Sequence, residues 1–321
     1  MKKTTKIWII TATILVLAGI IISTAALAAT GWNFENLSNS KYETNSHEID
    51  EEFQNIAIES STAEIVFKPS DTETTKVLCF EDIKTKHSVA VENGTLVIEE
   101  TDSRQWFDFI GLFHFDFPKI TVYLPQNSYA SLFIETDTGD VEIPAEFSFG
   151  NITATGDTGD IQCFASAMKL LKLESDTGSV HAESLSAEEV DLSVDTGSMT
   201  AKDITCSGNM NIKAHTGDTN LTDITCKSLT AHSSTGDITL NNVIAAETFF
   251  LENDTGDIEF SDCDAAEIFA ETNTGEIFGT LLSEKIFFTN SSTGDIRVPQ
   301  SMSGGKCELS TNTGDIRIEL K

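Results

Sequence analysis

The stretch SSTGDITLNNVIAAETFFLENDTGDIEF, residues 233–260, contains two successive copies of the unit that decides the fold. Each copy has Thr, Gly and Asp in a row, followed by apolar residues at alternate positions. After Gly236 these are Ile238 and Leu240, and the same positions of the next copy are also apolar. Alternation of this kind is typical of a strand with one buried face. A glycine between two such runs indicates a tight turn, because glycine adopts positive φ without steric cost.

The unit recurs along most of the chain, with its Thr-Gly pair every 19 or 20 residues. The ten glycines are Gly139, Gly159, Gly178, Gly197, Gly217, Gly236, Gly256, Gly275, Gly294 and Gly314. Asp, Ser or Glu follows each of them, and Asp follows seven. We therefore predict an all-β fold, a single-stranded β-solenoid (β-helix) of 19–20-residue coils. Each coil would contribute two short strands, paired in register with the next coil about 4.8 Å away.

The N-terminus has the pattern of a membrane anchor. Lysines at positions 2, 3 and 6 precede an uncharged apolar run over residues 7–29, which is long enough to span a bilayer. The positive-inside rule predicts a single-pass protein of the cell membrane, with a cytoplasmic N-terminus and an extracytoplasmic body. A cleaved signal peptide is the alternative, since Ala26-Leu27-Ala28 fits a cleavage site.

Four segments follow from these patterns. We predict an anchor or signal peptide at 1–30, a juxtamembrane spacer at 31–42, a β-rich cap at 43–129 and the solenoid at 130–321. The cap region contains a degenerate coil with Ala63 in the glycine position, strands at 76–80 and 119–124, and a hairpin around Asn93-Gly94. At the other end, DIRIELK (315–321) is predicted to form the final edge, protected by its charged residues.

Charge limits the classes of partner. The chain has 20 Lys and Arg against 51 Asp and Glu, a formal net charge of −31. Such a protein would repel nucleic acid and anionic lipid surfaces. We therefore expect no nucleic-acid partner and no direct adsorption of the acidic body to anionic lipid, with the N-terminal helix as the contact with the membrane.

Several segments resemble a bacterial family of adhesin-like envelope proteins built from β-strand repeats, with LiaG-like proteins among its members. The segments are KYETNSHEI (41–49), EFQNIAIES (52–60), ENGTLVIEE (92–100), KITVYLP (119–125) and the Thr-Gly-Asp repeats. The resemblance implies an envelope location and a stacked-strand architecture. It provides no catalytic residues.

The acidic residues around the repeat glycines are candidate calcium ligands. In-register stacking would align them in two columns, and carboxylates about 5 Å apart attract divalent cations. The candidates are Asp137, Asp140, Asp157, Asp160, Asp176, Asp195, Asp254 and Asp257. The alternative is turn chemistry, in which these side chains hydrogen-bond the backbone. We expect no cofactor. Calcium bound by these carboxylates is the alternative.

An enzymatic function is not expected. Asp-Thr-Gly also occurs in aspartic proteases, but those enzymes bring together two copies of the motif rather than ten. In this chain His215, Ser234 and Asn273 replace the Asp in some copies, which a turn tolerates and a catalytic dyad does not. The His residues are scattered and the cysteines have no metal-ligand spacing. Five of the six cysteines fall in predicted core positions, and a Cys206–Cys226 disulfide between adjacent coils is the alternative.

The aromatic run RQWFDFIGLFHFDF (104–117) is the remaining candidate site. It could cover the open end of the solenoid, or it could form an exposed surface for a partner or the bilayer. The candidate contact residues are Trp106, Phe107, Phe109 and Phe113.

We therefore predict a non-catalytic, adhesin-like binding protein of the cell surface that contacts an envelope polymer or an envelope protein. The alternative is an accessory regulator of envelope-stress sensing that acts through protein–protein contacts.

Overall fold

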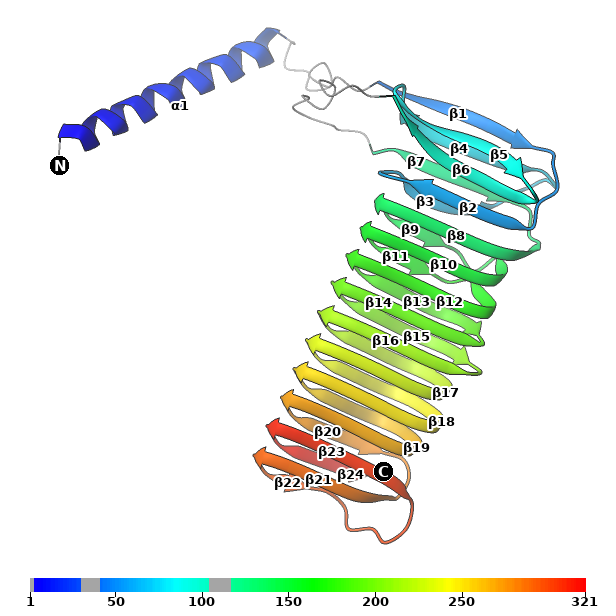
Figure 1. Cartoon of the computed structure of the whole chain (residues 1–321), viewed down its shortest axis with the longest axis vertical. Coiled ribbons are helices and arrows are strands. Elements are labelled where there is room, and N and C mark those ends of the chain that lie inside the picture. The colour runs from blue at the N-terminus through cyan, green and yellow to red at the C-terminus, as the bar shows by residue number, and fades with distance from the viewer. Residues whose placement is uncertain (1–2, 30–40, 104–116) are drawn as a thin grey trace.

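A computed structural model describes residues 3–29, 41–103 and 117–321. Helix α1 (Lys3–Ala29) precedes a β-structure that extends as a long rod (Figure 1). The helix contains one apolar segment, Trp8–Ala25, long enough to cross a membrane. A membrane anchor and a signal sequence both meet that description. Because α1 connects to the rod through β1, the opposite end of the rod is called the distal end below.

The region near the N-terminus contains seven strands: β1 (Tyr42–Ile49), β2 (Asn55–Ser60), β3 (Glu64–Pro69), β4 (Thr75–Asp82), β5 (Thr85–Glu92), β6 (Thr95–Asp102) and β7 (Lys119–Leu124). Strands β5 and β6 form the antiparallel hairpin predicted around Asn93-Gly94, where both residues have positive φ. Strand β4 lies antiparallel between β1 and β7. These pairings close the N-terminal end of the rod.

The rod itself contains seventeen strands: β8 (Ser128–Thr138), β9 (Val141–Ile143), β10 (Ser148–Thr158), β11 (Ile161–Cys163), β12 (Ser166–Thr177), β13 (Val180–Ala187), β14 (Glu189–Thr196), β15 (Met199–Cys206), β16 (Asn209–Thr216), β17 (Thr219–Thr235), β18 (Ile238–Thr255), β19 (Ile258–Thr274), β20 (Ile277–Leu281), β21 (Lys285–Thr293), β22 (Ile296–Arg297), β23 (Gly305–Thr313) and β24 (Ile316–Leu320). All of their pairings with one another are parallel, and the register is kept apart from local shifts such as the one between Cys226 and Ser228 of β17. The predicted β-solenoid is confirmed.

Alternate side chains fill one continuous core along the rod. In β17, for example, Leu221, Ile224, Cys226, Leu229 and Ala231 are buried, and the residues between them are exposed or half-buried. Each coil covers the apolar face of its neighbours, and a repeat of this length could not bury that face alone. The core therefore depends on stacking rather than on any single coil.

The prediction of two short strands per coil is wrong for β17, β18 and β19. In these coils one strand of 17 or 18 residues runs from one repeat glycine to the next. The chain changes direction at Asp223, Asn242 and Asp262, which have φ between 52° and 57°. Asn and Asp adopt this left-handed conformation more readily than other non-glycine residues. The corner is therefore made by one residue and the coil remains a continuous strand.

The last two coils are not stacked in sequence order. Strand β23 pairs with β19 on one side and with β21 on the other, and β24 likewise pairs with β20 and β22. The C-terminal coil therefore lies between two earlier ones, as Figure 1 shows at the distal end. The prediction that DIRIELK forms the final edge is wrong. The outermost coil is β21–β22, and Pro299 follows it closely, which suits an edge because proline cannot donate to a further strand.

Candidate functional site

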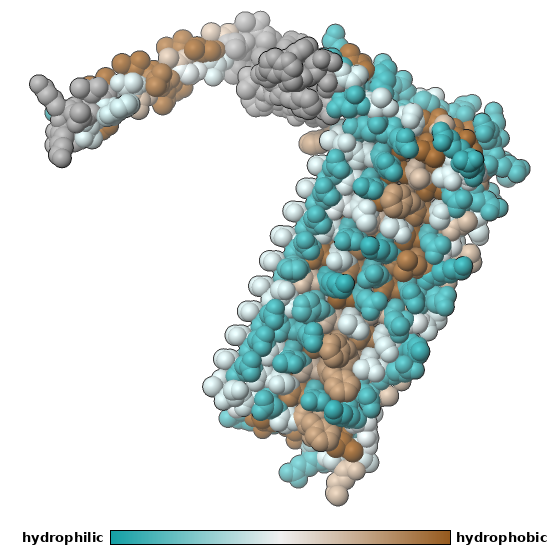
Figure 2. Space-filling model, in the orientation of Figure 1, coloured by the Kyte–Doolittle hydropathy of each residue, from teal (hydrophilic) through white to brown (hydrophobic). Residues whose placement is uncertain are grey.

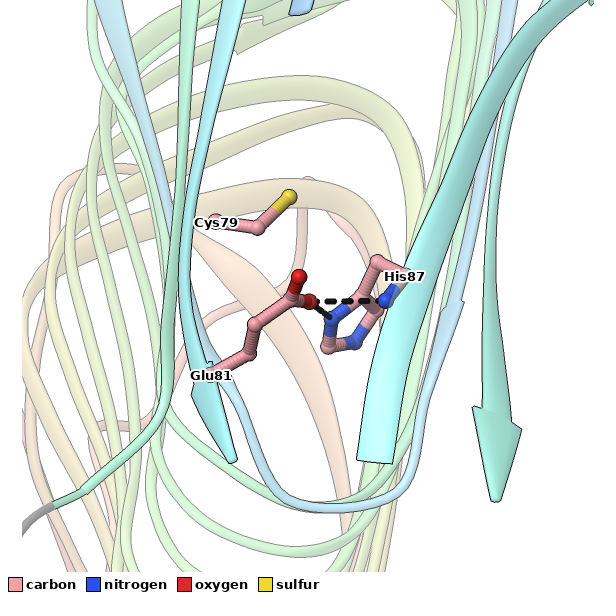
Figure 3. A group of neighbouring side chains, drawn as sticks. All are labelled: Cys79, Glu81 and His87. Carbon is pink, nitrogen blue, oxygen red and sulfur yellow. Dashed lines mark hydrogen bonds and ion pairs between the residues drawn. The ribbon is translucent and has the colours of Figure 1, made fainter. Parts of the chain in front are cut away.

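A cluster of polar side chains lies inside the N-terminal end of the rod. Cys79 and Glu81 are two residues apart on β4 and therefore point to the same face. His87 on β5 faces them, and the structure brings a ligand atom of each of the three within 4.8 Å of the other two (Figure 3). All three residues are buried. Among the described residues they are the one group of three or more His, Cys, Asp or Glu close enough to share a metal ion.

The Glu81 carboxylate holds the cluster together. Its Oε2 accepts hydrogen bonds from the backbone N–H of His87 at 2.7 Å and from Nδ1 of the His87 ring at 2.8 Å. Its Oε1 accepts a third from Nδ2 of Asn45, at 2.7 Å. A buried carboxylate needs such partners, because an unpaired one is costly to desolvate.

The second ring nitrogen of His87 faces an outer layer of the same cluster. Nε2 lies 3.0 Å from Oγ of Ser60 and 3.8 Å from Oε2 of Glu100. Glu100 is directly opposite His87 in the β5–β6 hairpin, and Ser60 is the last residue of β2. The imidazole therefore lies between two carboxylates, and no Lys or Arg forms an ion pair with either of them among the described residues.

The Cys79 thiol completes the cluster on the inner side. Burial raises its pKa to about 12, and the charge on nearby Glu81 adds to this effect. Since the thiolate is the reactive form of cysteine, this thiol is not a nucleophile at neutral pH.

The order Ser60, His87, Glu81 matches the nucleophile, base and acid of a hydrolase triad. Ser60 is only 5% exposed, however, and its Oγ also lies 3.4 Å from Oε2 of Glu100, an acceptor that competes for its only proton. A substrate carbonyl would have to reach this hydroxyl. The geometry therefore favours a structural or metal-binding role over nucleophilic catalysis.

An acidic groove of about 240 Å³ opens at the surface above the cluster. Its lining residues are Glu59, Ser60, Ser61, Glu99, Glu100, Glu135 and Asp137. Ser60 and Glu100 are thus shared between the groove and the buried cluster. One predicted calcium candidate, Asp137, lies on this groove.

The predicted acidic columns are present as stacked, solvent-facing turns. In the column after the glycines, six of the seven aspartates accept a backbone hydrogen bond from an adjacent coil. The backbone N–H of Asp160, for example, donates to Asp140 at 2.9 Å, and that of Glu276 donates to Asp257 at 2.7 Å. In the column before them, Asn273 donates to Asp254 at 3.0 Å. The members Asp137, Asp157, Asp176 and Asp195 are exposed in this second column. Turn chemistry accounts for these contacts, and calcium binding remains a prediction.

Two other predicted features have simple outcomes. Trp106, Phe107, Phe109 and Phe113 lie outside the described residues. All six cysteines are described, and all are buried free thiols, so the alternative Cys206–Cys226 disulfide is not formed in the structure.

An exposed aromatic patch occupies one face near the distal end. It comprises Phe250 on β18, Phe269 on β19, Phe288 on β21 and Lys306 on β23, and is called the distal aromatic patch below. The Lys306 ammonium lies 4.8 Å from the ring centre of Phe269 and 5.7 Å from that of Phe288. A shallow groove of about 210 Å³ runs beside Phe250 and Phe269, with carboxylates of Glu252, Glu271 and Glu308 along it. Figure 2 shows apolar side chains gathered along this face of the rod.

Sequence reasoning missed the cluster and the patch. The cluster had one signal, the Cys-x-Glu spacing of residues 79–81 on a predicted strand, but nothing in the sequence placed His87 against it. The patch had a signal in the repeat alignment, where an outward position becomes Phe at 250 and 269.

A match to one protein family agrees with this architecture. A family model described as Toastrack DUF4097 matches residues 53–224 and 197–321. A search of curated proteins gives no match. Among solved structures, a candidate adhesin from Bacteroides fragilis is 17% identical, covers 88% of this chain and 99% of its own, and has a TM-score of 0.41. A candidate adhesin from Parabacteroides distasonis is 12% identical, with 87% and 98% covered and a TM-score of 0.47. A candidate lipid-binding protein from the same species is 12% identical, with 86% and 97% covered and a TM-score of 0.33.

Proposed function

The chain belongs to the Toastrack DUF4097 family, and we propose that it is a non-catalytic, adhesin-like binding protein held at the cell surface by its N-terminal helix. Its ligand in this proposal is a glycan polymer of the cell envelope, bound at the distal aromatic patch. The apolar segment Trp8–Ala25 would act as the anchor, with the rod outside the cytoplasm.

The observation that carries the proposal is a change from polar to aromatic side chains along one column of outward-facing, paired residues. Paired residues in the middle coils are polar: Lys172, Asp191, Asn211 and Thr230 follow one another from coil to coil. The next partner of Thr230 is Phe250. Phe250 is 43% exposed and Phe288 is 53% exposed. Since an outward position in a solenoid needs no aromatic residue for folding, exposed rings gathered at one end favour a binding surface.

The chemistry around the rings suits a sugar polymer. Flat aromatic faces present apolar area with a polar edge nearby, and the carboxylates of Glu252, Glu271 and Glu308 can accept hydrogen bonds from hydroxyl groups. The net charge of −31 opposes binding to anionic lipid. The distal position favours contact away from the anchoring membrane.

The test uses the full chain in detergent and insoluble cell-wall glycan as the probe. We expect co-sedimentation of the parent protein and at least tenfold weaker binding of a Phe250→Ser/Phe288→Ser double variant. Thermal unfolding should change little, because both side chains are exposed.

A matched control changes the same column in the middle of the rod, with Asn211→Ser and Thr230→Ser. This variant should bind like the parent. The proposal is wrong if the parent does not sediment with the glycan, or if the double Phe variant binds as well as the parent.

A further inference from the structure

We propose that Cys79, Glu81 and His87 form a binding site for one zinc-like transition-metal ion inside the N-terminal end of the rod. The three side chains offer a sulfur, an oxygen and a nitrogen, the ligand set that zinc uses in proteins. The thiol makes calcium and magnesium unsuitable, because those ions prefer oxygen ligands only. The site is separate from the acidic columns of the rod and from the distal aromatic patch.

The ligands are already positioned by the backbone. Cys79 and Glu81 lie on one face of β4, and the backbone N–H of His87 donates to Glu81 at 2.7 Å, which fixes β5 against that face. With the ligand atoms within 4.8 Å of one another, an ion at their centre needs side-chain adjustments rather than a change of fold.

An outer layer supports the ligands in the way that metal sites require. A metal-bound histidine commonly donates its other ring N–H to an oxygen, which fixes its tautomer. Here Nε2 of His87 lies 3.0 Å from Oγ of Ser60, with Oε2 of Glu100 at 3.8 Å. The second oxygen of Glu81 is held at 2.7 Å by Asn45. Glu81 and His87 therefore each have one polar atom that faces the other ligands. The second polar atom of each is hydrogen-bonded to a residue outside the three, Asn45 for Glu81 and Ser60 for His87.

Charge and access both favour a cation. The cluster contains two carboxylates, Glu81 and Glu100, and one imidazole, so a divalent ion would offset its negative charge. The acidic groove, lined by the carboxylates of Glu59, Glu99 and Glu135, reaches Ser60 and Glu100, which lie beside the His87 ring, so an ion would enter from this side by displacement of the Ser60 and Glu100 side chains. A buried metal site needs such an entry path.

The binding step is balanced in protons. The ion replaces the proton of the Cys79 thiol, which passes to solvent. On the imidazole, Nδ1 releases its proton to solvent and coordinates the ion, and Nε2 takes up one proton from solvent and donates a hydrogen bond to Oγ of Ser60, so the ring gains and loses one proton. A water molecule can complete a tetrahedral set, since three protein ligands leave one position open.

The experiment is a cobalt titration of the full chain in detergent after treatment with a chelator. Cobalt takes the place of zinc in such sites and reports on its ligands by absorption. We expect one equivalent of Co²⁺ to produce a thiolate-to-cobalt charge-transfer band in the near ultraviolet, and one equivalent of Zn²⁺ to remove it. Zinc should also raise the melting temperature.

Variants assign the band to these residues. Cys79→Ser should abolish it, and His87→Gln should weaken cobalt binding at least tenfold. The matched control is Cys163→Ser, which removes another fully buried thiol from a place outside the cluster, and it should keep the band. If a cluster variant unfolds, the cobalt band and the zinc-dependent rise in melting temperature are compared in the parent and in Cys163→Ser, and both should be present in both proteins.

The proposal is overturned if the parent shows neither band nor thermal shift, or if Cys79→Ser retains the band. Ions bound at the aspartate columns would give no thiolate band.

Discussion

The repeat glycine is fixed by the close approach of stacked backbones. A Cβ atom built on Gly197 would lie 1.9 Å from the carbonyl oxygen of Gly178, and φ at Gly197 is 146°. The same contact recurs along the rod, at Gly217 against Gly197 and at Gly236 against Gly217. Both sterics and conformation therefore exclude a side chain. A turn that merely needed flexibility would not require glycine in every copy.

Replacing Gly197 with Ala should destabilise the rod by about 3 kcal/mol or more, because the backbone must move away from the neighbouring coil. Gly156→Ala is the matched control. Its nearest contact would be the Cγ2 atom of Thr136 at 3.4 Å, with no positive φ, so its effect should stay within about 1 kcal/mol. Urea denaturation followed by circular dichroism measures both. Equal midpoints for the two variants would contradict the steric explanation.

At the scale of the element, most neighbouring turns are joined by a side-chain acceptor as well as by the strand ladder. The Asp257 carboxylate accepts the backbone N–H of Glu276 at 2.7 Å, and the backbone N–H of Asp257 donates to Asp237 at 2.8 Å. Asp, Ser and Glu recur at this position because a short oxygen-bearing side chain can reach the next coil. The Thr-Gly-Asp motif is therefore a stacking motif.

Asp257→Ala should lower the free energy of unfolding by about 1 kcal/mol, since it removes one hydrogen-bond acceptor. Asp257→Asn keeps an oxygen at the same place and should remain near the parent. Melting temperatures measured with EDTA and again with calcium separate the two explanations of the column. If calcium stabilises the parent but not Asp257→Asn, the carboxylate charge matters and the column is a cation site.

Some features of the strands and turns could be predicted from the sequence and others could not. The coil length, the glycine turn and the Asn93-Gly94 hairpin followed from local patterns, and each has a local physical cause. The contact of His87 with Cys79 did not, because it depends on how the strand before the hairpin folds over it. The order of the distal coils could not be predicted either. Every coil presents nearly the same faces to its neighbours, so the repeat pattern alone does not specify which coil follows which.

At the scale of the whole molecule, both ends of the stack depart from sequence order. Near the N-terminus, the coil of β2 and β3 lies between β6–β7 and β8–β9. At the distal end, β23–β24 lies between β19–β20 and β21–β22. The middle coils follow one another in order. Each end of the solenoid therefore has one coil inserted between two coils that are consecutive in the sequence.

Engineered cysteine pairs test the distal order. Nδ2 of Asn312 donates to Oδ1 of Asn273 at 3.0 Å, so Asn273→Cys/Asn312→Cys should form a disulfide under mild oxidation. Asn273→Cys/Ser292→Cys should not, because the C-terminal coil separates these positions. The native thiols should not interfere, since burial raises the pKa of Cys163 and of Cys307 to about 12. A disulfide in the second variant and none in the first would mean that the coils stack in sequence order.

The inserted C-terminal coil has a consequence for biosynthesis. Chains are made from the N-terminus, and a solenoid can add coils as they emerge. This rod cannot assemble in that way at its distal end, because the outermost coil rests on residues that are made after it. The distal aromatic patch takes Lys306 from that later coil and Phe288 from the one it supports. A chain that stopped before residue 305 would therefore lack an assembled tip.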